Sequence, residues 1–239
     1  MVESCLLCPH RGSCILGGQS RKVVRDFSAS LKRRSIHGKG RAVFHQGDLF
    51  RDYQLLCEGS VKLVKVLRGG EQAIIDVLEP FSFLSLIPEQ KQSRHRCTAV
   101  ALTETSEIAS IGEARLNSLL RLHPELGFAM ARYFSERLSA AGRLLVSMRL
   151  PVWDKLLSYL AGRISLGKAR GARHIIDLHL SHRDLAELIQ TTPESLSRAF
   201  RRLQDEGILR VRKGVIEIIQ VELVSGYLED NADRDRGDN

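Results

Sequence analysis

The sequence predicts an α+β protein in which an N-terminal antiparallel β-roll, or jelly roll, is followed by a long helix and a winged helix-turn-helix. Short apolar runs recur between turn signals from about residue 36 to 111, which indicates short strands. Apolar residues then recur at helical spacing over residues 113–150, and residues 181–218 have the pattern of two helices and a hairpin. At 239 residues the chain is longer than most single domains of about 100–200 residues, so we expect two domains.

Charge and hydropathy restrict the classes of function. Lys and Arg outnumber Asp and Glu by 36 to 28, and the formal net charge of +8 favours a polyanionic partner. There is no run of about 18 apolar residues, and the N-terminal MVESCLLCPHRGSC lacks the order of a signal peptide, so we expect a cytoplasmic protein without a membrane partner. No phosphate-binding glycine loop, HExxH motif or serine elbow occurs, and we do not expect an enzyme.

The predicted organisation has five parts. These are a cysteine segment over residues 1–20, the β-roll over 21–112, a dimerisation helix over 113–150, the winged helix-turn-helix over 151–228 and a disordered polar tail over 229–239. Within the second part, a basic helix-like stretch at residues 22–34 precedes the strands. Pro151 ends the long helix because its ring disfavours helical geometry in the preceding residue.

The long helix carries a narrow apolar stripe. Its members step by three and four residues: Ala131, Phe134, Leu138, Ala141, Leu145 and Met148. This is the a/d spacing of a coiled coil. The stripe could pack on the helix's own domain, but on a helix that links two domains it favours pairing with a second copy. We therefore expect a homodimer.

Two helices joined by a tight turn are predicted over residues 181–207. Ser181 is placed to cap the first helix, and Thr192 to cap the second, which has Pro193 at its first position. Gly207 is placed to end the second helix. The following segments, residues 208–212 and 215–220, form a hairpin wing around Lys213-Gly214, and the wing's cations are expected to contact phosphates.

The second of these helices has the composition of a recognition helix. Leu196, Phe200 and Leu203 share one face and supply its core, which leaves polar side chains on the others. Arg can pair with guanine O6 and N7, Glu can accept from cytosine N4, and the N-terminal half of a recognition helix contacts base edges. The predicted DNA-contacting residues are Ser181, Arg183, Thr192, Glu194, Ser197, Arg198, Arg201 and Lys213.

Three of the five cysteines lie within ten residues of one another. The spacing is Cys5-x2-Cys8-x5-Cys14. Structural disulfides are not expected in a reducing compartment, and such a cluster is better suited to binding a metal than to packing. The other two cysteines are Cys57 and Cys97.

A roll of short strands, a long helix and a winged helix-turn-helix together resemble the CRP/FNR family of bacterial transcription regulators. The resemblance covers about residues 5–222, with the motifs FHQGD (44–48), LLCEGSVKLVKV (55–66), LTETSEIASI (102–111) and ESLSR (194–198). It implies a cyclic-nucleotide-binding-like roll, a palindromic double-stranded DNA operator and contact with RNA polymerase. Glu194, Ser197 and Arg198 resemble the FNR branch, which implies TTGAT-type half-sites read by these three residues.

The resemblance argues against a cyclic nucleotide as the signal. In this family a Gly-Glu pair holds the ribose and an Arg-Ser pair holds the phosphate, and the corresponding region here is SFLSLIPEQKQSRHRC. Arg96 is retained, but the Glu is replaced within Leu84–Leu86 and the Ser by Cys97. A ribose hydroxyl would lose its carboxylate partner.

The spacing of Cys5, Cys8 and Cys14 matches that of the oxygen-sensing FNR proteins, which implies a 4Fe–4S cluster. All-cysteine zinc sites usually contain two short cysteine pairs, and only one is present, so iron–sulfur is favoured over zinc. The position of the fourth FNR ligand corresponds to Ala109, which cannot bind a metal. We predict Cys97 as the fourth ligand, with Cys57 as the alternative. In a jelly roll the strands of these two cysteines can be antiparallel neighbours, which would bring the two thiols close together. A non-cysteine ligand, a bound thiol or a three-ligand cluster stays open.

The cluster implies that oxygen or redox state controls dimerisation and hence DNA binding. Three other modes remain open from the sequence. These are haem held by a His or Cys ligand, oxidation of the cysteines to disulfides, and regulation without any effector.

Overall fold

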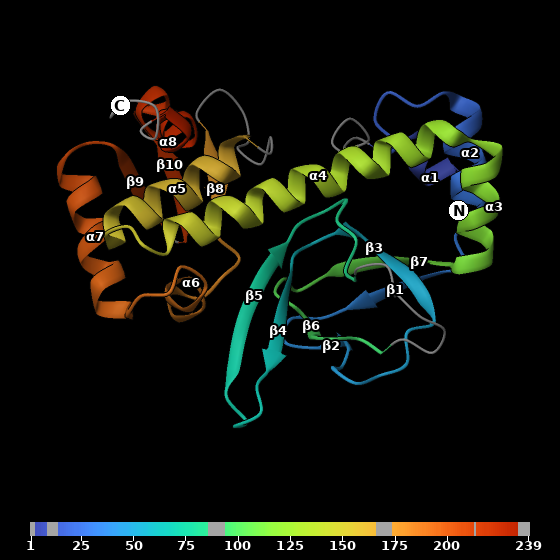
Figure 1. Ribbon diagram of the computed structural model, residues 1–239, viewed down its shortest axis with the longest axis horizontal. Coiled ribbons are helices and arrows are strands. Elements are labelled where there is room, and N and C mark those ends of the chain that lie inside the picture. The colour runs from blue at the N-terminus through green and yellow to red at the C-terminus, as the bar shows by residue number, and fades with distance from the viewer. Residues whose placement is uncertain (1–2, 9–13, 86–93, 166–173, 213, 234–239) are drawn as a thin grey trace. The chain divides into compact units, whose positions relative to one another are not determined.

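The computed structural model describes residues 3–8, 14–85, 94–165, 174–212 and 214–233. The chain divides into two compact units, Met1–Ser135 and Glu136–Asn239, and the division falls within a long helix (Figure 1). The first unit contains the predicted β-roll and the second the predicted winged helix-turn-helix. The predicted fold class is confirmed.

The first unit begins with two helices, α1 (Glu3–Leu6) and α2 (Arg21–Ser30). The Ser20 side chain caps α2 by accepting a hydrogen bond from the Val23 amide at 3.3 Å. α2 is shorter than the helix-like stretch predicted over residues 22–34. The chain becomes extended at Leu31 and then enters a strand that pairs along β7, which sequence periodicity did not indicate.

Seven antiparallel strands form two sheets of the roll. The strands are β1 (Arg33–His37), β2 (Ala42–Phe44), β3 (Asp52–Glu58), β4 (Val61–Val66), β5 (Gln72–Leu78), β6 (Thr98–Ala101) and β7 (Ser106–Gly112). One sheet has the order β1-β7-β3 and the other the order β2-β6-β4-β5 (Figure 1). Because β3 and β6 belong to different sheets, the prediction that the strands of Cys57 and Cys97 are neighbours is wrong.

The sheet β1-β7-β3 has an apolar core on each face because its side chains alternate. Leu56 and Ile108 face the inside of the roll and belong to the roll core, which comprises Phe44, Leu56, Val61, Leu78, Leu84, Cys97, Ala99 and Ile108. Leu55 and Ile111 belong to a second cluster with residues of the helices. We call this cluster the helix-side core; it comprises Ile15, Leu16, Val23, Val24, Phe27, Tyr53, Leu55, Phe83, Ile111, Leu116, Leu119, Leu126 and Met130.

The single helix predicted over residues 113–150 is two helices, α3 (Glu113–Leu122) and α4 (Pro124–Ser147). The break lies at His123, whose φ of −133° and ψ of 76° are not helical. Pro124 causes this, since its ring excludes the preceding residue from helical geometry. His123 is buried and its Nε2 lies 2.8 Å from Asp26 Oδ2, which ties the break to α2. Among the described helices, α4 included, none is long and apolar enough to cross a membrane.

The second unit is a winged helix-turn-helix. Its elements are α5 (Val152–Ser165), β8 (Ile175–Asp177), α6 (His182–Leu188), α7 (Pro193–Asp205), β9 (Leu209–Arg212), β10 (Val215–Ile218) and α8 (Val221–Asp233). The strands form an antiparallel sheet of order β8-β10-β9, and β8 was not predicted. Leu156, Leu160 and Ile176 are fully buried with Leu196 and Leu203 in one apolar core.

The C-terminal helix corrects one prediction. The disordered tail was predicted from residue 229, but α8 extends to Asp233, and only residues 234–239 lie outside the described part. α8 is bonded to α5 by a short chain of hydrogen bonds. Trp153 Nε1 donates to Tyr227 Oη at 3.1 Å, and Tyr227 Oη donates to Asp154 Oδ1 at 2.9 Å.

Candidate functional site

Side-chain caps fix the starts of α6 and α7. Ser181 Oγ accepts from the Asp184 amide at 3.0 Å, and Thr192 Oγ1 accepts from the Ser195 amide at 3.2 Å, so both predicted caps are confirmed. The turn between α6 and α7 places Gln190 at a φ of 50°, and Gly207 follows α7 with a φ of 67°. Two caps and two left-handed residues therefore set the length and direction of α7.

One face of α7 is buried and the other is open to solvent. The buried side chains are Leu196, Ala199, Phe200 and Leu203, which pack in the core of the second unit. The exposed side chains include Glu194, Ser197, Arg198 and Arg201. The apolar face thus holds the helix against its domain, while the predicted base-reading residues lie on its solvent side.

The predicted readers lie together in the N-terminal half of α7. Arg198 Nη2 donates to Ser195 Oγ at 2.8 Å, and Ser197 Oγ lies 3.5 Å from His182 Nε2 of α6. The pKa of Glu194 is lowered, first by a hydrogen bond from its own backbone amide, then by the Thr192 hydroxyl and by attraction to Arg198. Glu194 is therefore a charged acceptor beside the Arg198 donor.

The remaining cationic side chains of this region differ in whether they are available to contact DNA. Arg202 lies over the Trp153 ring at 4.0 Å and its Nε bonds to Glu206 Oε1 at 2.8 Å, so it serves the packing of α7 on α5. In the wing, Arg210 pairs with Glu217 at 3.5 Å, whereas Arg212 is exposed. Lys213, a predicted phosphate contact, lies outside the described residues. The other predicted contacts, Ser181, Arg183 and Thr192, are exposed at the starts of α6 and α7.

Family comparisons match both units. The family model of the cyclic nucleotide-binding domain matches residues 37–123, and that of the Crp-like helix-turn-helix domain matches residues 154–224. The chain belongs to the CRP/FNR family of transcription regulators. Regulators of this family bind DNA and act as dimers, and the CRP/FNR regulator described here is not an enzyme.

The curated relatives cover nearly the whole of this CRP/FNR regulator. It is 27% identical over 217 residues to the Cyclic AMP receptor protein of Thermus thermophilus, which covers 90% of this chain and 96% of the relative. It is 25% identical over 217 residues to the Nitrogen fixation regulation protein FixK of Bradyrhizobium diazoefficiens, with 90% of each chain covered. The relatives include different regulators, so they leave the signal undecided.

Solved structures show the same fold. The structure of FixK2 from Bradyrhizobium japonicum matches with a TM-score of 0.69 at 16% identity, covering 82% of this chain and 96% of that one. The regulator CLP of Xanthomonas campestris, titled as responsive to c-di-GMP, matches with a TM-score of 0.64 at 20% identity, covering 83% and 99%. At these identities the likeness concerns the fold alone.

The structure brings the three N-terminal cysteines near one another. Cys5, on α1, and Cys14 both pack against the helix-side core. The pKa of the Cys14 thiol is raised to about 11, mainly by burial and further by the charges of Cys5 and Cys8. Even so, within the described residues no group of three His, Cys, Asp or Glu side chains is close enough to hold a metal ion. The predicted ligands are neighbours without a preassembled site.

The two other thiols lie elsewhere in the roll. Cys97 is buried in the roll core, on the other side of the sheet β1-β7-β3 from the helix-side core that Cys5 and Cys14 contact. Cys57 is half-buried on β3, with Sγ 3.8 Å from the Leu55 carbonyl oxygen. Ala109 is fully buried in β7. The structure therefore does not place Cys97 with the three N-terminal cysteines, and the fourth ligand stays a prediction.

The cysteine segment and α4 pack against the same apolar core. Cys14 packs against the helix-side core, to which α4 contributes Leu126 and Met130, and Tyr133 packs against this core as well. Tyr133 Oη accepts from the Phe83 amide at 3.1 Å, and burial is the main cause that raises the pKa of Tyr133. One face of α4 and the segment that carries the cysteines thus share the helix-side core.

Another face of α4 exposes the predicted dimerisation stripe. Leu138 is 75% exposed and Leu145 is 64% exposed, and Ala131 and Ala141 are also exposed. Phe128, 79% exposed, extends this stripe by one step of three residues, and its spacing from Ala131 could have identified it from the sequence. Two predicted members of the dimerisation stripe are less available for contact with a second copy. Phe134 packs beside Phe83 and Tyr133 in its own unit, and Met148 is half-buried.

Two of the positions that the resemblance compares with the nucleotide site are buried. Leu84 and Cys97 both lie in the roll core, whereas Arg96 is exposed. The expectation that this regulator does not sense a cyclic nucleotide stays a prediction.

Proposed function

We propose that this CRP/FNR regulator is an oxygen- or redox-responsive homodimer that binds a palindromic operator of TTGAT-type half-sites under the control of an iron–sulfur cluster in its cysteine segment. The observation that supports this most is the apolar core that the cysteine segment shares with α4. Cys14 packs against the helix-side core, to which α4 contributes Leu126 and Met130, and the same helix exposes the stripe of Phe128, Ala131, Leu138 and Leu145. A change at the thiols can therefore reach the dimer surface through this core.

Side chains in the N-terminal half of α7 contact the bases of the operator. Arg198 donates to guanine O6 and N7, Glu194 accepts from cytosine N4, and Ser197 bonds an adjacent base edge. Arg183 and Arg212 contact phosphates, which adds affinity without sequence information. A second copy supplies the second half-site, and tethering two readers gives a joint affinity about 10²–10⁴ times that of one. RNA polymerase is the further partner that the family resemblance implies.

The stripe on α4 is apolar surface that a second copy would cover. Burial of apolar surface contributes about 25 cal/mol per Å², and exposed large apolar side chains at regular spacing on one helix mark an interface. Two copies of α4 related by a two-fold axis would pack Leu138 and Leu145 against their equivalents. The exposed Ala131, Ala141 and Gly142 would allow a close approach of the two helices.

Cys5, Cys8 and Cys14 would hold the cluster, which when bound supplies oxygen-sensitive iron–thiolate bonds. Cys5 comes from α1, and Cys14 precedes a turn closed by the Gly17 amide donating to the Cys14 carbonyl oxygen at 2.7 Å. Ligation by these thiols would draw α1 and this turn together over the helix-side core. Because Cys97 lies in the roll core, a fourth ligand other than Cys97 fits the placement better.

Thiol oxidation is the competing mechanism, since the same proximity would also allow a disulfide. A thiol reacts as its thiolate, and the raised pKa of Cys14 leaves that thiol protonated at neutral pH. A metal also binds the thiolate, so the pKa of Cys14 does not separate the two mechanisms. Peroxide treatment separates the two mechanisms: thiol oxidation predicts that DNA binding changes while the iron content stays the same, and the cluster mechanism predicts that DNA binding changes only when iron is lost.

The test is the iron and acid-labile sulfide content of anaerobically purified full-length protein. Cys5→Ser, Cys8→Ser and Cys14→Ser are each expected to lose the cluster and its visible absorption. Cys97→Ser is the matched control, and we expect it to retain both. Iron content unchanged in Cys5→Ser and Cys8→Ser would contradict the proposal, and loss in Cys97→Ser would restore Cys97 as the fourth ligand.

A further inference from the structure

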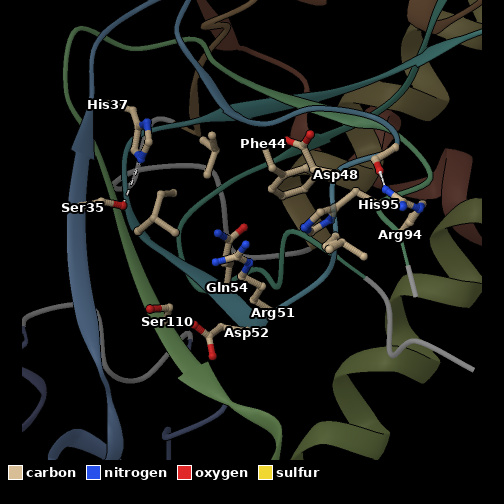
Figure 2. Close-up of a pocket in the computed structure, with 14 residues that line it drawn as sticks. Ser35, His37, Phe44, Asp48, Arg51, Asp52, Gln54, Arg94, His95 and Ser110 are labelled. Carbon is tan, nitrogen blue, oxygen red and sulfur yellow. Dashed lines mark hydrogen bonds between the residues drawn. The ribbon is translucent and has the colours of Figure 1, made fainter. Parts of the chain in front are cut away.

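The open end of the β-roll contains a polar pocket of about 600 Å³ (Figure 2). We call it the mouth pocket. It is lined by β1, β2, β3 and β7, by the loop of residues 47–51, and by Arg94 and His95. None of Leu84, Arg96 and Cys97 lines it. The mouth pocket is therefore distinct from the positions that the family resemblance compares with the nucleotide site.

Polar side chains replace the apolar ones on the inner face of the sheet where the mouth pocket begins. Leu56 and Ile108 pair with each other across β3 and β7 and fill the roll core. One step along the same face, the pair is Gln54 and Ser110, and Ser35 of β1 lies opposite Ile108. The strands thus change from an apolar to a hydrogen-bonding surface at this end of the roll.

Among the residues that the structure describes, two buried polar atoms at the mouth pocket have no hydrogen-bond partner. These are Gln54 Oε1 and His95 Nδ1. His95 is only 8% exposed, and its ring stacks on Phe44 with centroids 3.7 Å apart and an interplanar angle of 15°. Its backbone is bonded on both sides, to the Gly47 amide and to the Asp48 carbonyl oxygen. The ring is held in place, and such unpaired buried atoms are uncommon in native structures.

The charges that line the mouth pocket leave an excess of available cations. Both carboxylates are engaged: Asp52 Oδ1 bonds to Lys32 Nζ at 2.8 Å, and Asp48 Oδ2 accepts from the His45 amide at 2.8 Å. Arg94 donates to the Gly47 carbonyl oxygen at 2.7 Å (Figure 2). Within the described residues neither Arg94 nor Arg51 forms an ion pair. Guanidinium groups match the geometry of carboxylates and phosphates.

We propose that the mouth pocket binds a small organic anion that carries hydroxyl groups. Arg51 and Arg94 would bind the carboxylate or phosphate, and a ligand hydroxyl would donate to Gln54 Oε1. His95 Nδ1 would take a second hydrogen bond, and carbon atoms of the ligand would pack on Phe44. The volume is within the range of about 300–1,000 Å³ typical of small-molecule sites. This inference does not depend on the iron–sulfur cluster.

The test is calorimetric titration of the full-length protein, without DNA, with four matched compounds. Malate carries carboxylates and a hydroxyl, glycerol 3-phosphate carries a phosphate and hydroxyls, succinate lacks the hydroxyl, and glycerol lacks the anion. We expect malate or glycerol 3-phosphate to bind at least tenfold more tightly than its matched compound. Binding of malate alone identifies a carboxylate ligand, and binding of glycerol 3-phosphate alone identifies a phosphate ligand. No binding of either, or succinate binding as tightly as malate, overturns the proposal.

Two substitutions connect that binding to the mouth pocket. Gln54→Leu removes the unpaired acceptor at similar size, and we expect at least tenfold weaker binding with a melting temperature equal to or above that of the wild type. Arg51→Gln should weaken binding as well, while Arg68→Gln, an equal loss of charge in the β4–β5 turn outside the pocket, should not. Wild-type affinity in Gln54→Leu and Arg51→Gln overturns the assignment. Because no iron or DNA is needed, failure here leaves the proposed function untouched.

Discussion

Arg198 and Arg202 lie four residues apart on α7 but serve different purposes. Arg198 is exposed and held by Ser195, beside the lowered-pKa carboxylate of Glu194. Arg202 is stacked on Trp153 and bonded to Glu206. The sequence assigned both to the polar face of the helix, and only the packing of α5 beside α7 separates a base reader from a structural cation.

We predict that Arg198→Ala relaxes specificity, while Arg212→Gln weakens binding to every sequence alike. Loss of a bidentate base contact costs about 1–3 kcal/mol against the wrong base, and loss of one phosphate contact lowers the salt slope by about 1. The measurement is operator affinity for matched and single-base-changed half-sites over a range of salt. Arg202→Gln is the control, with a lower melting temperature and unchanged half-site preference. Equal specificity in Arg198→Ala and the wild type would refute the assignment.

Burial lowers the pKa of His95, and attraction to Asp48 opposes this only in part. The fold therefore favours neutral His95, and below about pH 6.5 the unfolded chain binds more protons than the folded one. The stabilisation is present above the unfolded pKa and is lost as the pH falls through the folded pKa. We expect His95→Gln to lose less stability than the wild type between pH 7 and pH 5, measured by thermal unfolding. The exposed His45→Gln should behave as the wild type; a His95→Gln profile parallel to it would show this reasoning to be wrong.

At the scale of elements, α4 shows which features the spacing of apolar residues can predict and which it cannot. The spacing of Leu138, Ala141 and Leu145 predicted an exposed apolar stripe, because i, i+3 and i+4 residues share a face whatever surrounds the helix. The assignment of Phe134 to the same stripe missed its packing on Phe83, which comes from a distant part of the chain. The break at His123 could have been predicted from Pro124 but was not.

We predict that Leu138→Arg converts the protein to a folded monomer. Since Leu138 is 75% exposed, its replacement disturbs no core of the single chain, but it places a charge in the proposed interface. Light scattering should give the monomer mass, circular dichroism should be unchanged, and operator affinity should fall about 100-fold or more. Glu136→Arg, on the opposite side of the same helix, is the control. A Leu138→Arg dimer with wild-type affinity would show that α4 pairs through another face.

For the whole molecule, features that depend on neighbouring residues in the sequence were predicted, and features that depend on distant residues were not. The caps Ser181 and Thr192 and the terminating Gly207 were identified because a cap depends only on the next few residues. Arg33 and Arg34, the first two residues of β1, were assigned to the helix-like stretch, because the start of this strand is set by its pairing with β7, which is distant in the sequence. The sheet order separated Cys57 from Cys97, and residue spacing could not show that Cys14 packs against the same core as Leu126 and Met130 of α4.

The proposed signalling depends on the helix-side core, because Cys14 packs against it and α4, the helix that exposes the dimer stripe, contributes Leu126 and Met130 to it. The most direct test is the affinity of the full-length protein for a palindromic TTGAT operator, measured anaerobically and again after exposure to air, for the wild type and Cys5→Ser. We predict that the anaerobic wild type binds about 100-fold or more tightly than the air-exposed protein, as expected when two tethered readers become one, and that Cys5→Ser shows no such difference. Equal wild-type affinity under both conditions would contradict the account.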